Sequence, residues 1–170
     1  MGLIIKNKLQ SLMRGYPTVS DKYDVAPAVL EGDTAVKAGA PVALTSVAGR
    51  YTAVGSSTTI GQIAGFVLAS NVKVPNVYPA STDDQTYVSG EAFNLMIKGF
   101  IAVPVTLASA ETITNGQAAY IVIGGASAGM ITVSGHTETG GTATQLPGAY
   151  FTGETEVVNG ETLAELCFNL

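Results

Sequence analysis

Apolar and polar positions divide the chain into a helix-like start and a long series of strand-like segments. Residues 3–14 are followed by Gly15 and Pro17, which are helix-stop signals. Four apolar residues recur before that stop at helical spacing: Ile5, Leu9, Leu12 and Met13. The pattern predicts a short amphipathic helix over 3–14, which needs a surface to lie on because about twelve residues rarely hold a helix in water. Residues 16–30 contain two prolines and predict an extended linker.

Beyond residue 30, short runs of β-branched and small residues alternate with turn residues, and no long helical pattern remains. The predicted strands are 34–37, 41–45, 50–54, 61–69, 86–88, 93–97, 99–107, 118–123, 129–133, 148–152 and 163–168. Many short strands at this spacing predict an all-β fold, either a small barrel or a sandwich. Residues 71–85 form the one long irregular loop. We therefore expect an N-terminal arm over 1–30 and a β-barrel body over 31–170.

The body contains a weak internal echo. Residues 36–39 match residues 113–116 in pattern, and an apolar run follows each of them. Two further matches join the stretches that begin at Gly49 and Gly129, and those that begin at Gly65 and Gly148. The matched positions are 77, 80 and 83 residues apart. Two related half-barrels would produce this echo, and so would chance in a Gly-rich β chain.

Charge also separates the start of the chain from the rest. Four basic and two acidic residues give residues 1–25 a net charge of +2, whereas four basic and eleven acidic residues give the remainder −7. Only 12% of the residues are charged, about half the usual share. A surface rich in Thr, Ser and Gly, extensive burial against partners, or both would account for so few charges. The negative body disfavours nucleic-acid binding, because phosphate groups would be repelled.

Cysteine usage and hydropathy place further limits on the chain. Cys167 is the single cysteine, so it cannot form an internal disulfide, and its apolar surroundings predict a buried thiol. No apolar run reaches the length of a membrane span, and we expect no membrane partner. Lys6 and Lys8 interrupt the only run that could resemble a secretory signal. We expect synthesis in a reducing, cytosol-like compartment.

One motif raises the question of hydrolase chemistry. Gly125-Ala-Ser127-Ala-Gly129 fits the G-x-S-x-G nucleophile elbow, which requires a following helix and then an acid and a histidine in chain order. A strand-like run follows here instead, and no acidic residue lies between Ser127 and His136, the only histidine. We therefore predict a turn between two strands. A hydrolase that uses Ser127 is the weakest alternative.

The other candidate sites are incomplete. His136 lacks the neighbouring Cys or Asp that a zinc site needs. Asp83, Asp84 and Glu91 show neither the EF-hand spacing nor the aromatic residues that line a glycosidase cleft, so we expect a solvated loop. No phosphate-binding loop is present. We expect no catalytic residue, no metal and no cofactor.

Five runs of the body carry a family resemblance. They are Glu31-Gly-Asp-Thr-Ala-Val-Lys-Ala-Gly-Ala-Pro-Val-Ala-Leu, Ile60-Gly-Gln-Ile-Ala-Gly-Phe-Val-Leu, Gly99-Phe-Ile-Ala-Val-Pro, Ile113-Thr-Asn-Gly-Gln-Ala-Ala-Tyr and Pro147-Gly-Ala-Tyr-Phe. In them the chain resembles the small β-barrel proteins that decorate tailed-phage capsids, called head decoration or structural cement proteins. The resemblance covers residues 16–170, rests on fold motifs rather than catalytic ones, and leaves the first 14 residues uncovered.

The resemblance implies a structural role without enzyme activity. Such proteins bind the outside of the expanded capsid shell and brace neighbouring capsomers. The implied partners are the major capsid protein and neighbouring copies of the chain, which form trimers in many members and bind as monomers or dimers in others. The implied location is the exterior of the virion, after synthesis in the cytoplasm of the bacterial host.

The arm is the expected capsid-binding element, because it joins apolar and basic side chains. The candidate contacts are Ile5, Lys6, Lys8, Leu9, Leu12, Met13, Arg14, Tyr16 and Lys22. The alternative function is a receptor- or glycan-binding head-fibre or adhesin domain. Its candidate residues are Tyr78, Tyr87, Asp83 and Asp84, all expected in an exposed loop.

Overall fold

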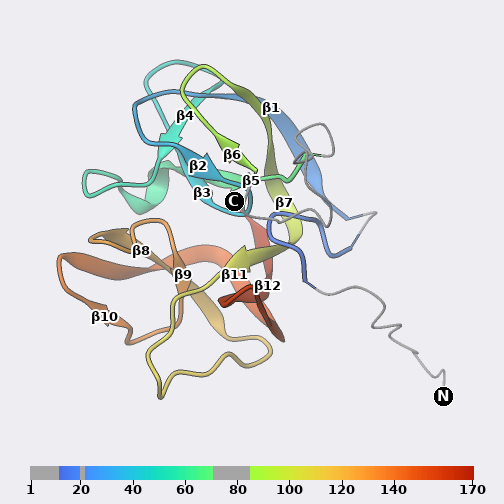
Figure 1. Ribbon diagram of the computed structural model, residues 1–170, viewed down its shortest axis with the longest axis vertical. Coiled ribbons are helices and arrows are strands. Elements are labelled where there is room, and N and C mark those ends of the chain that lie inside the picture. The colour runs from blue at the N-terminus through green and yellow to red at the C-terminus, as the bar shows by residue number, and fades with distance from the viewer. Residues whose placement is uncertain (1–11, 20–21, 71–84) are drawn as a thin grey trace.

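The computed structural model describes residues 12–19, 22–70 and 85–170, which form strands and turns almost throughout (Figure 1). The strands are β1 (Asp24–Leu30), β2 (Val36–Lys37), β3 (Pro41–Leu44), β4 (Arg50–Ala53), β5 (Ile63–Val67), β6 (Thr86–Tyr87), β7 (Ala92–Pro104), β8 (Ala118–Gly124), β9 (Ile131–Thr132), β10 (Thr137–Glu138), β11 (Gly141–Val158) and β12 (Glu161–Asn169). A 3-10 turn, η1 (Ile60–Gln62), precedes β5. The predicted all-β fold class is confirmed.

The first barrel is a closed ring of five strands. Its order is β1-β4-β3-β5-β7, and β7 pairs back with β1. The β1–β4 pair is parallel and the other four pairs are antiparallel. Side chains from these strands and from β2 and β6 fill the interior, among them Leu30, Val42, Tyr87 and Leu95. Closure removes the exposed strand edges that an open sheet would present.

The second barrel uses the other end of β7. From there the order continues β12-β11-β8-β9, and a parallel bridge between Val105 and Ile131 returns β9 to the end of β7. Figure 1 shows the two groups of strands one above the other, with β7 passing between them. A hydrophobic cluster separate from the interior of the first barrel joins them, in which Phe66 on β5 and Phe168 on β12 pack with ring centroids 4.7 Å apart.

The two barrels repeat one topology. In chain order, the first barrel consists of β1, β3, β4, β5 and the first part of β7. The corresponding strands of the second barrel are the end of β7, then β8, β9, β11 and β12, and corresponding pairs run in the same direction. Backbone hydrogen bonds repeat as well. Gly39 N donates to Val67 O at 2.7 Å, and Gly116 N donates to Phe151 O at 2.8 Å. The internal echo in the sequence therefore marks two related barrels rather than two halves of one barrel.

A second internal match was not apparent from the strand pattern. Val88-Ser-Gly-Glu91 leads into β7, and Val158-Asn-Gly-Glu161 leads into β12, at corresponding places in the two barrels. Both turns place a glycine in the left-handed region, with φ of 84° at Gly90 and 82° at Gly160. The repeat therefore extends to the turns that start the corresponding strands.

The predicted linker over 16–30 contains a barrel strand. Residues 24–30 form β1, and Ala28 and Leu30 are buried in the first barrel. The prolines suggested a linker. In the structure Pro27 pairs with β7 on one side, but on the other side β4 pairs only with Val29 and Leu30, so that edge of β1 is open at Pro27. Proline is tolerated on an open edge because no ladder hydrogen bond is lost there. The sheet thus begins before residue 31, the predicted start of the body.

Other predicted elements differ in extent. The helix predicted over 3–14 is not present at residues 12–14, which bond to the body instead of to a helical turn, and residues 3–11 lie outside the described residues. The strands predicted at 93–97 and 99–107 are one strand, β7, which continues through Gly99. β11 is longer than predicted, and β10 was not predicted. Of the predicted loop over 71–85, only Gln85 is described, and its side chain is buried.

Candidate functional site

Residues 15–18 are fastened to the body as an added strand-like segment. Gly15 N donates to Ala102 O at 2.8 Å, and Thr18 N donates to Phe100 O at 3.1 Å. The segment runs antiparallel to β7 beside Ile101. β1 runs antiparallel to the earlier part of the same strand, beside Ala92–Lys98. The described part of the predicted arm is therefore built into the fold.

Arg14 ties this segment to both barrels. Its Nε donates to Ala38 O at 2.6 Å, and its Nη1 lies 2.6 Å from Glu161 Oε1 at the start of β12. Only 7% of Arg14 is exposed, whereas 30% of the Glu161 side chain is exposed, so the ion pair is shielded from water only on the arginine side. Next to it, Leu12 N donates to Glu156 Oε2 on β11 at 2.7 Å. Residues 12–18 thus hold parts of the first and second barrels in one set of contacts, which we call the N-terminal anchor.

Gly15 allows the anchor to lie this close to the body. Its φ is +73°, and a Cβ atom built there would lie 2.6 Å from Gly39 N. A side chain would therefore face both an unfavourable backbone conformation and a clash with backbone that cannot move aside. The glycine that signals a helix stop in the sequence serves in the structure as a close-approach point.

The candidate contact residues have different surroundings. Arg14 is committed to its own body, Leu12 and Tyr16 are half-buried, and Met13 and Lys22 are exposed. The Tyr16 hydroxyl accepts a hydrogen bond from Gln85 Nε2 at 3.4 Å. The remaining candidates lie outside the described residues: Ile5, Lys6, Lys8 and Leu9. The structure therefore brings only part of the predicted set onto an open surface.

The G-x-S-x-G motif forms a turn between two strands, as predicted. Ser127 lies between β8 and β9, and its backbone N–H donates to Glu138 Oε1 at 2.7 Å. This bond and a second bond from the Ala126 backbone lower the pKa of Glu138. Desolvation raises the pKa, but the hydrogen bonds outweigh it. A strand follows Ser127, whereas a nucleophile elbow requires a helix.

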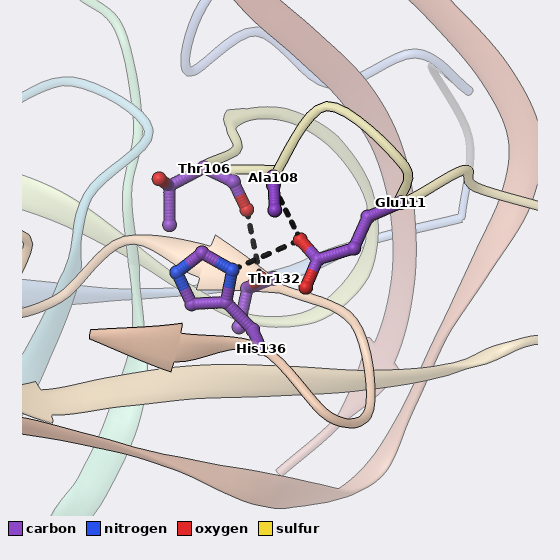
Figure 2. A network of polar contacts seen from close by, with 5 residues as sticks. All are labelled: Thr106, Ala108, Glu111, Thr132 and His136. Atoms are coloured by element: carbon purple, nitrogen blue, oxygen red, sulfur yellow. Dashed lines mark hydrogen bonds and ion pairs between the residues drawn. The ribbon is translucent and has the colours of Figure 1, made fainter.

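His136 pairs with Glu111 on the second barrel (Figure 2). His136 Nδ1 lies 2.9 Å from Glu111 Oε2, which also accepts a hydrogen bond from Ala108 N at 2.6 Å. Desolvation raises the pKa of Glu111, but the bonds from Ala108 and His136 together outweigh it and hold the pKa below its ordinary value. Beside this pair, Thr132 Oγ1 donates to Thr106 O at 2.7 Å. These contacts join the segment after β7 to β9 and the turn after it, and we call them the polar clasp.

The described residues contain no group of three or more His, Cys, Asp and Glu side chains placed to hold a metal ion. Nor does any helix within residues 12–19, 22–70 and 85–170 have the length and apolar character to cross a membrane. Tyr87, expected in an exposed loop for the glycan-binding alternative, is 2% exposed and packs in the first barrel core. The prediction for Tyr87 is wrong because the residue pairs in β6, and the other candidates of that alternative lie outside the described residues.

Sequence reasoning missed the partners of the anchor. Glu156 and Glu161 lie more than a hundred residues from Arg14 in the chain, and nothing in their local pattern indicates the contact. Cys167 also differs from its prediction, because it is half-buried rather than buried. The one local signal at these residues is the repeated turn Val158–Glu161. It shows that Glu161 of the second barrel corresponds to Glu91 of the first, but it does not indicate the contact with Arg14.

Comparison with known proteins agrees with this architecture. A family model described as "Structural cement protein (E217 gp24/Pam3 gp6)" matches residues 6–169. A solved structure titled "The capsid of Myoviridae Phage XM1" contains a chain with a TM-score of 0.64 and 18% identity, and the match covers 99% of this chain and 97% of that one. No curated protein sequence matches. The structural likeness supports the fold, and because the family match spans nearly all of the sequence, this chain belongs to the phage structural cement protein family and is a structural component of the virion with a capsid-cementing role.

Proposed function

We propose that the N-terminal residues bind the outer face of the expanded capsid while the double-barrel body braces neighbouring capsomers. The anchor at residues 12–18 is the observation that carries this proposal. It bonds to both barrels through Leu12 and Arg14, so a load on the residues before it would pass into the whole body. A brace requires such a stiff connection between its attachment point and its core.

The composition of the first residues suits a capsid surface of acidic and apolar character. Residues 1–11 contain Lys6 and Lys8 together with the apolar Ile5 and Leu9, and no acidic residue. Apolar side chains would supply affinity by leaving water, and lysines would favour an acidic surface. Arg14 is assigned to the anchor rather than to the capsid, because its guanidinium is already paired.

Cementing depends on many copies that act together. Each contact can be weak if neighbouring copies share the load, because linked contacts multiply the overall affinity. We propose the major capsid protein as the direct partner and a trimer of this chain as the unit that spans a local three-fold axis. Synthesis in the host cytoplasm is consistent with the single cysteine, and the role requires neither catalysis nor a cofactor.

Co-sedimentation with expanded capsids tests the proposal. Deletion of residues 1–11 should abolish binding but keep the thermal unfolding transition, because the anchor stays in place. Lys6→Glu with Lys8→Glu should weaken binding, whereas Lys37→Glu with Arg50→Glu, an equal charge change at exposed positions of the body, should leave it near wild type. Full binding by a folded deletion variant would reject the N-terminal residues as the attachment point.

A further inference from the structure

A groove of about 460 Å³ lies where the start of β1 meets β7 and the neighbouring parts of β11 and β12. Its lining includes two lysines and four side chains with large apolar or sulfur-bearing surfaces: Lys22, Lys98, Tyr23, Phe100, Tyr150 and Cys167. We call it the Tyr–Lys groove. It lies outside the anchor and the polar clasp, so neither of those sets of contacts explains it.

Two glycines give the groove its shape. A Cβ atom at Gly99, where φ is +134°, would lie 2.6 Å from Lys22 O. A Cβ atom at Gly148, where φ is +71°, would lie 2.7 Å from Asn169 O. Both positions need glycine because the neighbouring backbone approaches too closely for a side chain. The groove is therefore a product of the backbone fold.

The walls of the groove expose aromatic surface. Tyr23 is 39% exposed and Tyr150 is 41% exposed, and Phe100 on β7 is half-buried. Tyr150 lies opposite Cys167 in the β11–β12 pair, and the neighbouring Cys167 side chain raises the pKa of Tyr150. Exposed aromatic side chains are common anchors of protein interfaces.

The groove is also a positive site on a negative body. Lys22 and Lys98 are both exposed, and within the part of the chain that the structure describes neither has an ion-pair partner. Asp24 lines the same groove, so its lysines and carboxylate give a net charge of +1. Residues 26–170 carry −7 overall. An acidic partner would be repelled by most of the body and attracted here.

We propose that the Tyr–Lys groove binds an acidic segment of the capsid protein that also presents an apolar side chain. Carboxylates of that segment would lie against Lys22 and Lys98, and its apolar side chain would pack on Tyr23 and Tyr150. The inference rests on the proposed capsid binding and adds a second contact, on the body, to the one made by the N-terminal residues. Two separate contacts on one rigid molecule are what a brace between neighbouring subunits needs.

Charge reversal tests the inference on the full chain with expanded capsids as the probe. Lys22→Glu with Lys98→Glu should raise the Kd from co-sedimentation by about tenfold, and the loss should shrink at high salt. Lys37→Glu with Arg50→Glu is the matched control and should leave the Kd at the wild-type value. Tyr150→Ser should also weaken binding, whereas Val157→Ser, at a 68% exposed position of the same strand, should not.

The outcomes separate this inference from the proposed function. If wild-type protein does not bind capsids, both are wrong. If it binds and the groove variants bind equally well, only the groove inference is overturned. Equal weakening by the control pair would indicate general charge repulsion and would also overturn it. If sedimentation velocity shows that the groove variants lose self-association, the occupant is a second copy of this chain and the assignment to the capsid protein fails.

Discussion

The two barrels share a topology but close in different ways. The first closes at the seam between β1 and β4, which pair over two register positions, whereas its β1–β7 pair of six positions has a counterpart of seven in the β12–β7 pair of the second barrel. The second closes through one isolated bridge, between Val105 and Ile131, with the polar clasp beside it. A repeated fold can therefore keep its strand order while it exchanges backbone hydrogen bonds for side-chain contacts at the seam.

The comparison also shows how the barrels are joined. They share β7, they share a core through Phe66 and Phe168, and the anchor bonds to both. The core contact, the anchor and the polar clasp at the seam of the second barrel involve different side chains, so each can be weakened separately. We expect their loss to matter in the order core, anchor and clasp.

The largest effect is expected from the shared core. Phe66→Ala should lower the free energy of unfolding by about 3–5 kcal/mol, because it removes a fully buried ring and leaves a cavity against Phe168. Thermal and denaturant unfolding of the purified variant measure this loss. Val157→Ala, on an exposed site, is the control and should change stability little. Two separate transitions in the variant would mean that the barrels no longer unfold as one unit, and an unchanged midpoint would contradict the shared core.

An intermediate effect is expected from the anchor. Arg14→Ala should cost about 2 kcal/mol, because the buried Ala38 O loses its donor and the partly exposed Glu161 loses its ion-pair partner. Denaturant unfolding of Arg14→Ala, Glu161→Gln and the double variant gives their coupling. Arg14→Lys keeps the charge but not the planar group that bonds in two directions, so it should recover only part of the loss. Additive single effects would show that the two side chains do not interact.

The smallest effect is expected from the polar clasp. Glu111→Gln should cost about 1 kcal/mol near neutral pH, because a charged acceptor is lost to Ala108 N and His136. The pKa of Glu111 is lowered in the folded protein, so its contribution is present above the unfolded value of about 4.3 and is lost as pH falls through the folded value.

Unfolding measured from neutral to acidic pH should therefore show the wild type and Glu111→Gln converging in acid. Glu154→Gln, at another half-buried carboxylate of the second barrel, provides a comparison across the same pH range. A difference between wild type and Glu111→Gln that persists below the pKa of Glu111 would mean that shape rather than charge holds the clasp.

Much of the strand pattern was predictable from local sequence. The predicted strands at 41–45, 50–54 and 118–123 match β3, β4 and β8 closely, because each is a short apolar run bounded by turn residues. β1 was not predicted, because Pro27 resembles a linker residue until its open edge is known. The Tyr–Lys groove was not predictable, because Lys22, Lys98 and Tyr150 belong to three separate stretches of the chain.

The sequence by itself determined the all-β class, the family and the opposite net charges of residues 1–25 and 26–170, and it suggested the internal repeat. These properties depend on local spacing and composition, which the chain carries before it folds. Only the tertiary structure decided that Arg14 bonds to both barrels, that Tyr87 is core, and that two lysines and two tyrosines meet in one groove. The physical reason is that barrel closure brings together residues far apart in the chain, and their contacts depend on the register of strands that no local pattern specifies.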